Sequence, residues 1–142
     1  MQVKHAMTKK VLVVKPDTTV KEAAKVMTEH RVGSLVVMEN DKVVGIVTEL
    51  DIIWKVVAGN LNPEATLVKD IMTKKILTIQ GDKTLEDATH MMVENNIKKL
   101  PVMEGDKLIG ILTATDLISV QPKMIESLAK LILFEEKKAV AG

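Results

Sequence analysis

The stretch GIVTELDI (Gly45–Ile52) recurs sixty-five residues later as GILTATDL (Gly110–Leu117), and this recurrence decides the fold. Sliding the sequence against itself by that distance aligns Val3–Ile53 with Val68–Ile118 without a gap, and about 23 of the 51 paired positions are identical. The chain therefore contains two copies of one unit, a first and a second repeat. The residues between them, Gly59–Leu67, are rich in turn-forming side chains and are typical of a linker.

Each repeat predicts the order strand, helix, strand, strand, helix. The β-branched run Val11–Val14 ends at a turn and predicts a strand, as Ile76–Ile79 does in the second repeat. A Thr followed three residues later by an acidic residue is a capping box, which predicts helices opening at Thr19 and at Thr84. Two apolar strands joined by a short polar turn then predict a hairpin, with strands at Leu35–Met38 and Val43–Val47 and, in the second repeat, at Leu100–Met103 and Leu108–Leu112.

The last helix of each repeat begins at Thr48 or Thr113. In the first repeat it carries Leu50, Ile53, Trp54 and Val57, and we expect this apolar face to point inward. Ile53 and Val57 are also candidates for a surface shared by two copies of the chain in a homodimer.

One repeat is too small to bury both faces of its sheet, so we expect two repeats packed through their sheets about an approximate twofold axis. The predicted fold class is mixed α/β (α+β). The predicted organisation is repeat unit 1–58, linker 59–67, repeat unit 68–120 and a C-terminal amphipathic helix and tail over 121–142, with Met124, Leu128 and Leu131 on the apolar face of that helix.

Composition excludes several classes of protein. The chain has 20 basic and 19 acidic side chains, and this near-neutral balance disfavours bulk binding to nucleic acid or to an anionic membrane. It has no cysteine for a disulfide framework, and no apolar run approaches the roughly 20 residues of a membrane span. With no signal-peptide pattern at the N-terminus either, we expect a cytoplasmic protein.

The order of predicted elements, the MT dipeptide that opens each repeat, LPVM (Leu100–Met103) and the ending Gly-x-x-Thr-x-x-Asp resemble the CBS domain, named after cystathionine β-synthase. The resemblance covers about Val3 to Val120 in both repeats and implies a stand-alone CBS pair. Proteins of this family typically bind adenosine-containing ligands in the clefts between two CBS units.

The resemblance also implies where such a ligand binds. The motif Thr and Asp contact ribose and phosphate, which assigns these roles to Thr48, Asp51, Thr113 and Asp116. Strand residues form the slot for the base, which implies Leu12, Val32 and Gly33 in the first site and Leu77 and Ile97 in the second. A basic residue for the phosphate corresponds to Lys98, whereas the first repeat has Gly33 there, so we expect unequal phosphate affinity.

The chemistry of these side chains agrees with the implied roles. A carboxylate near the start of a helix can accept two hydrogen bonds from a ribose diol. However, Thr48-x-x-Asp51 is also a capping box that needs no ligand, and Lys98 can be a solvated edge residue. The three histidines are far apart without metal-ligand spacing, and no nucleophile–base pattern is present, so we expect no metal, no cofactor and no enzymatic activity.

The predicted function is a regulatory module that binds AMP, ADP or ATP and passes a conformational signal to a protein partner. S-adenosylmethionine is an alternative ligand. A second alternative is a scaffold whose clefts are vestigial. A third is nucleic-acid binding through the lysine-rich segments Met7–Lys10 and Met72–Lys75, which the near-neutral charge disfavours.

Overall fold

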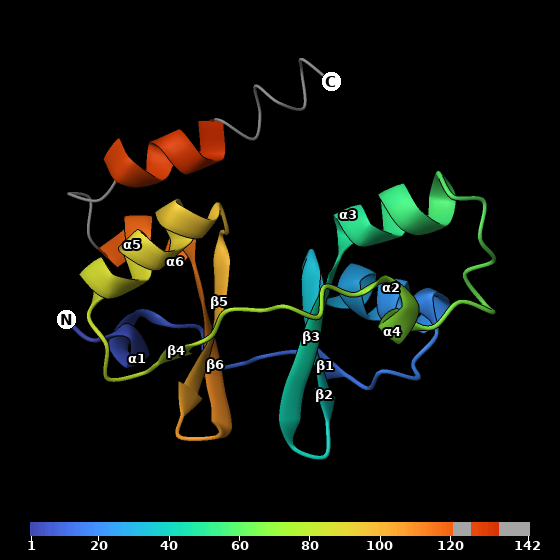
Figure 1. The fold of residues 1–142 in the computed structure, drawn as a ribbon, viewed down its shortest axis with the longest axis horizontal. Helices are drawn as coiled ribbons and strands as arrows, with labels where there is room; N and C mark the ends of the chain where they lie inside the picture. Colours follow the sequence, from blue (N-terminus) through green and yellow to red (C-terminus); the bar gives the residue numbers. More distant parts are fainter. Residues whose placement is uncertain (121–125, 134–142) are drawn as a thin grey trace. The chain divides into compact units, whose positions relative to one another are not determined.

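The computed structural model describes residues 1–120 and 126–133, which form a mixed α+β structure with two three-stranded sheets. The chain divides into two compact units (Figure 1). The central unit is Val11–Ile76, and the terminal unit combines Met1–Lys10 with the chain from Leu77 onward. Within the described ranges no helix is long and apolar enough to cross a membrane.

The sheet of the central unit has the order β1-β2-β3, with β1 parallel to β2 and β2 antiparallel to β3. The order of elements along the chain agrees with the prediction, followed by one further short helix. The elements are β1 (Val13–Val14), α2 (Val20–His30), β2 (Ser34–Glu39), β3 (Lys42–Thr48), α3 (Glu49–Asp51), the π-helix η1 (Ile52–Val57) and α4 (Val68–Ile71).

The terminal unit repeats this plan with the order β4-β5-β6 and the same strand directions. A helix over residues 126–133 adds to it, as predicted for the tail (the red helix in Figure 1). The other elements are α1 (Val3–Ala6), β4 (Ile79–Gln80), α5 (Leu85–Asn95), β5 (Lys99–Glu104), β6 (Lys107–Thr113) and α6 (Ala114–Val120). Met124, predicted to lie on the tail helix, falls outside the described residues.

Local chemistry explains the predicted boundaries. Thr19 Oγ1 accepts a hydrogen bond from Glu22 N at 3.2 Å, and Thr84 Oγ1 accepts one from Asp87 N at 3.1 Å, so both long helices begin where the capping residues stand. The β2–β3 hairpin turns at Asn40 and Asp41, whose φ angles are 52° and 63°. Two positive φ angles match the twist of the flanking strands, which is why Asn and Asp suit this turn.

The compact units differ in their boundaries from the sequence repeats, because the leading helix of each repeat joins the other repeat's core. Val3 of α1 is buried in the terminal core, and Val68 of α4 is buried in the central core. After α4 the backbone passes close to Gly45 in β3, and after α1 it passes close to Gly110 in β6. A Cβ on Gly45 would lie 2.9 Å from Thr73 O, and one on Gly110 would lie 2.9 Å from Thr8 O. Glycine is therefore required at both positions by close approach of the protein's own backbone.

The inward face of the last helix in the first repeat was predicted wrongly. Trp54 is 66% exposed and Val57 is 70% exposed, and Leu50 and Ile53 are exposed too. The inward residues are instead Ile52 and Val56. The physical reason is that six of the eight residues Leu50–Val57 are apolar, so their spacing fits more than one face of a helix. In the terminal unit the residue that matches Ile52, Leu117, is fully buried as well.

Each unit has its own apolar core. In the terminal unit the tail helix completes the core, since Leu128 is fully buried and Leu131 nearly so. In the central unit the core lies under α2, the hairpin and α4. The segment 59–67 is part of this unit, where Pro63 O and Thr66 O accept hydrogen bonds from Lys21 N and Val20 N at the start of α2.

Candidate functional site

The predicted Thr–Asp pair of the central unit lies where β3 meets α3. Thr48 N and Thr48 Oγ1 donate to Asp51 Oδ2 at 2.9 and 3.2 Å, and Asp51 N donates back to Thr48 Oγ1 at 3.2 Å. The other carboxylate oxygen, Oδ1, lies 3.2 Å from the ammonium group of Lys55. Both oxygens of Asp51 therefore have partners within the protein, and the residue is only 9% exposed.

The terminal unit repeats the cap with a different neighbour. Thr113 N donates to Asp116 Oδ2 at 3.0 Å, and Asp116 N donates to Thr113 Oγ1 at 3.0 Å. Thr8 Oγ1 lies 3.5 Å from the same Oδ2, at the limit of a hydrogen bond. Val120 occupies the position that corresponds to Lys55. Among the described residues, no ion pair reaches Asp116, and its half-buried Oδ1 has no hydrogen-bond donor.

Lys98, the predicted phosphate residue, and Gly33, which the first repeat has at that position, lie next to these caps. Gly33 O accepts a hydrogen bond from Glu49 N, and Lys98 O accepts one from Ala114 N, each at 2.9 Å. The Glu49 carboxylate lies against Gly33, 3.0 Å from the position of a Cβ there. The central site therefore contains a carboxylate where the terminal site has Ala114, and it lacks the lysine that the terminal site has.

The predicted base-slot residues fall into two groups. Leu12 and Val32 are partly buried against the central core, and Ile97 is partly buried against the terminal core. Leu77 is exposed. Val32 and Gly33 line a pocket of about 510 Å³, whose other lining residues are Ala24, Met27, Thr28, Arg31, Glu49, Ile52 and Ile53.

Two residues that distinguish the sites, Glu49 and Lys55, were missed by the sequence analysis. The signal was present in the aligned repeats, where Glu49 matches Ala114 and Lys55 matches Val120. Both differences change the charge beside a motif residue that is itself identical in the two repeats. Within the described residues, no group of three or more potential ligands could hold a metal ion.

Comparison with known proteins identifies the family. The model of the CBS domain matches residues 3–58 and again residues 68–123. The chain therefore belongs to the CBS domain family and carries two CBS domains. CBS pairs are regulatory modules in general, and these two domains account for most of the sequence.

Individual relatives agree with this assignment. A protein of Methanopyrus kandleri is 36% identical over 83% of this chain, which spans 61% of that relative. A conserved CBS domain protein from Thermoplasma acidophilum matches the fold over 96% of this chain and 76% of its own, with a TM-score of 0.85 and 27% identity. A hexameric CBS-CP12 protein from bloom-forming cyanobacteria covers 89% of this chain and 70% of its own, with a TM-score of 0.78 and 30% identity.

Proposed function

We propose that this CBS pair is a regulatory module that binds adenine nucleotides (AMP, ADP or ATP), and that the terminal site around Thr113 and Asp116 binds them more tightly than the central site. The observation that carries the proposal is the half-buried Asp116 carboxylate, which is oriented by its cap and keeps Oδ1 without a donor among the described residues. Such an oxygen is an acceptor for a ribose hydroxyl.

The charges around the two caps support the proposed order of affinity. In the terminal unit Lys98 stands one residue before β5, and its main-chain oxygen accepts a hydrogen bond from Ala114 N at the start of α6. We propose that its ammonium group contacts the phosphate of the ligand. In the central unit Glu49 would repel a phosphate, and a ribose would compete with Lys55 for Asp51. Ligand binding is proposed to change the conformation of the module and so to signal to a protein partner.

Thermal unfolding with AMP, ADP, ATP and S-adenosylmethionine tests the proposal. A ligand present at about 100 times its dissociation constant adds about 2.7 kcal/mol to the free energy of unfolding. For a chain of 142 residues that raises the Tm by about 9 °C. Asp116→Asn should remove most of this shift.

Asp87→Asn is the matched control, because Asp87 caps α5 with the same geometry and has no proposed ligand role. It should lower the Tm of the free protein slightly and leave the ligand-induced shift intact. Absence of a shift with all four compounds would refute the nucleotide proposal.

A second proposed property is a homodimer formed through the exposed face of η1. Ile53, Trp54 and Val57 form an exposed apolar surface on the central unit, and surfaces of this kind mark protein–protein contacts. In the terminal unit the residue corresponding to Ile53, Ile118, is instead packed against the core that the tail helix completes. The hexameric relative supports a tendency to assemble.

The dimer can be tested by sedimentation. Trp54→Glu should convert a dimer into a monomer, whereas Val93→Glu, a change at an exposed apolar residue of the terminal unit, should not. A wild-type protein that sediments as a monomer would exclude the dimer.

A further inference from the structure

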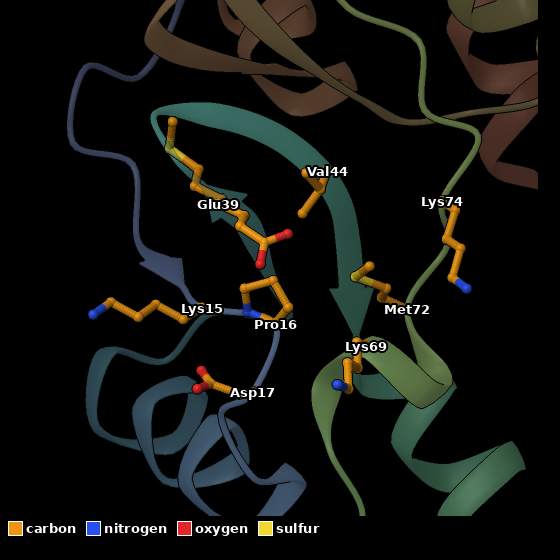
Figure 2. A pocket seen from close by; sticks show the side chains of 9 residues that line it. Lys15, Pro16, Asp17, Glu39, Val44, Lys69, Met72 and Lys74 are labelled. Atoms are coloured by element: carbon orange, nitrogen blue, oxygen red, sulfur yellow. The ribbon is translucent and has the colours of Figure 1, made fainter.

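A pocket of about 530 Å³ lies on the central unit, at the hairpin end of the sheet. Neither Thr48 nor Asp51 lines it, so it is separate from the Thr–Asp site. Its volume is within the range of about 300–1,000 Å³ that is usual for small-molecule sites. The lining residues are Lys15, Pro16, Asp17, Met38, Glu39, Val44, Lys69, Met72 and Lys74 (Figure 2).

Backbone hydrogen bonds hold the walls of the pocket in place. Lys69 N donates to Pro16 O at 3.0 Å, which fixes α4 against the turn that follows β1. Thr73 N and Ile46 N exchange hydrogen bonds with each other's carbonyl oxygens at 2.9 and 3.1 Å, which fixes the segment after α4 against β3. The pocket is therefore preformed by three bonded segments of one unit.

The lysines of the pocket have no direct ion-pair partner among the residues that the structure describes. In the described part of the chain, no carboxylate lies within 4.0 Å of the ammonium groups of Lys15, Lys69 or Lys74. Lys55, by contrast, contacts both Asp51 and Ile71 O. Figure 2 shows Lys69 and Lys74 on the side of α4 and the segment that follows it, with the Glu39 carboxylate near Pro16 and the Lys15 side chain extending away from the centre.

The corresponding place in the terminal unit is packed differently. Gly81 replaces Pro16 and Ile109 replaces Val44, and the Ile109 Cδ1 atom lies only 3.1 Å from where a Cβ of Gly81 would be. Lys15 is replaced by Gln80, whose side-chain amide exchanges hydrogen bonds with the backbone of Gly105 at 3.0 and 3.1 Å. Lys4 and Lys9 stand at the positions of Lys69 and Lys74. The terminal unit thus retains these two lysines, but Ile109 and Gly81 pack closely where the central unit is open.

We propose that this pocket, which we call the lysine pocket, binds a small phosphomonoester through Lys69 and Lys74. Lysine ammonium groups bind phosphate oxygens as point charges. Asp17 and Glu39 leave the lining with only one net positive charge, which disfavours a polyphosphate and offers acceptors to hydroxyl or amino groups of the ligand. Pro16, Val44 and the two methionines provide an apolar wall. This inference does not depend on the proposed nucleotide function.

Methyl-¹³C methionine NMR tests the proposal with glycerol 3-phosphate as the probe and glycerol as the phosphate-free control. The Met38 and Met72 signals should shift to saturation with glycerol 3-phosphate and stay unchanged with glycerol. Their counterparts Met103 and Met7 in the terminal unit should not move. Inorganic phosphate should give a weaker shift at the same two residues.

Paired variants identify the residues responsible. Lys69→Gln with Lys74→Gln should weaken glycerol 3-phosphate binding about tenfold or more, because two charge-assisted contacts are lost. Lys4→Gln with Lys9→Gln is the matched control and should leave binding unchanged. Asp51→Asn with Asp116→Asn should also leave it unchanged, which separates this site from the nucleotide sites.

Three results would overturn the proposal. The first is equal shifts at the methionines of both units, and the second is an equal effect of the two lysine pairs. The third is a shift of Met38 and Met72 with a DNA or RNA oligonucleotide at low salt but not with glycerol 3-phosphate, which would instead assign these lysines to nucleic-acid binding.

Discussion

The central and terminal units place the same Thr–Asp pair at the same end of a sheet but surround it with different charges. In the central unit Lys55 contacts Asp51, and Glu49 stands at the start of α3. In the terminal unit Val120 and Ala114 replace these two residues, and Lys98 precedes β5. The comparison teaches that the repeated motif preserves the cap, while the residues around it determine which charges surround the carboxylate.

The largest expected effect concerns the tail helix, which only the terminal unit has among the described residues. Leu128→Ala should lower the free energy of unfolding by about 2–5 kcal/mol, because it leaves a cavity in the core. Leu133→Ala, at an exposed position of the same helix, should change it by less than about 0.5 kcal/mol. Urea unfolding measures both values, and equal effects would show that the helix does not close the core.

The next largest loss of stability tests a feature that the two units share, the close approach of the backbone to Gly45 and to Gly110. Gly45→Ala and Gly110→Ala should each destabilise the protein by about 1–3 kcal/mol, since the new methyl group meets the carbonyl of Thr73 or Thr8. Similar losses in urea unfolding are expected from the two substitutions. A loss of stability from only one of the two substitutions would show that the backbone does not approach both glycines equally closely.

A smaller effect on the free energy of unfolding distinguishes Asp51 from Asp116 in the absence of ligand. Asp51→Asn leaves Lys55 without its charged partner and should cost about 1–3 kcal/mol, because Asp51 is largely buried. Asp116→Asn removes no ion pair and should cost less than about 1 kcal/mol, within the usual worth of one hydrogen bond. The reverse order in chemical unfolding would show that the two environments have been assigned wrongly.

The smallest effect concerns the helix caps outside the site. Thr19→Ala and Thr84→Ala should each cost about 1 kcal/mol, the usual contribution of an N-cap side chain. Neither substitution should alter nucleotide binding. A change in nucleotide affinity for either variant would show that capping alone does not explain these two threonines.

Much of the fold could be predicted from the sequence, because the decisive signals are local. The gapless repeat, the Thr caps and the Asn40–Asp41 turn each specify their own structure, and the structure confirms the elements that they predict. The family could also be predicted, since the motif occurs in the same place in both repeats.

Other features depend on information that a pattern does not contain. The sequence does not indicate which core Val3 and Val68 join, so the exchange of α1 and α4 between the repeats was not predicted. The last helix of the first repeat is apolar on more than one side, so periodicity alone did not identify Ile52 and Val56 as its inward residues. The lysine pocket arises from segments far apart in sequence and from the volume of single side chains, Val44 against Ile109.

The central claim is that the terminal site binds an adenine nucleotide more tightly than the central site. Calorimetric titration of the wild type, Asp51→Asn and Asp116→Asn with AMP, ADP and ATP tests it most directly. We predict that Asp116→Asn removes the tighter binding event and that Asp51→Asn leaves that event unchanged. Loss of the tighter event in Asp51→Asn, with Asp116→Asn behaving as the wild type, would contradict the account.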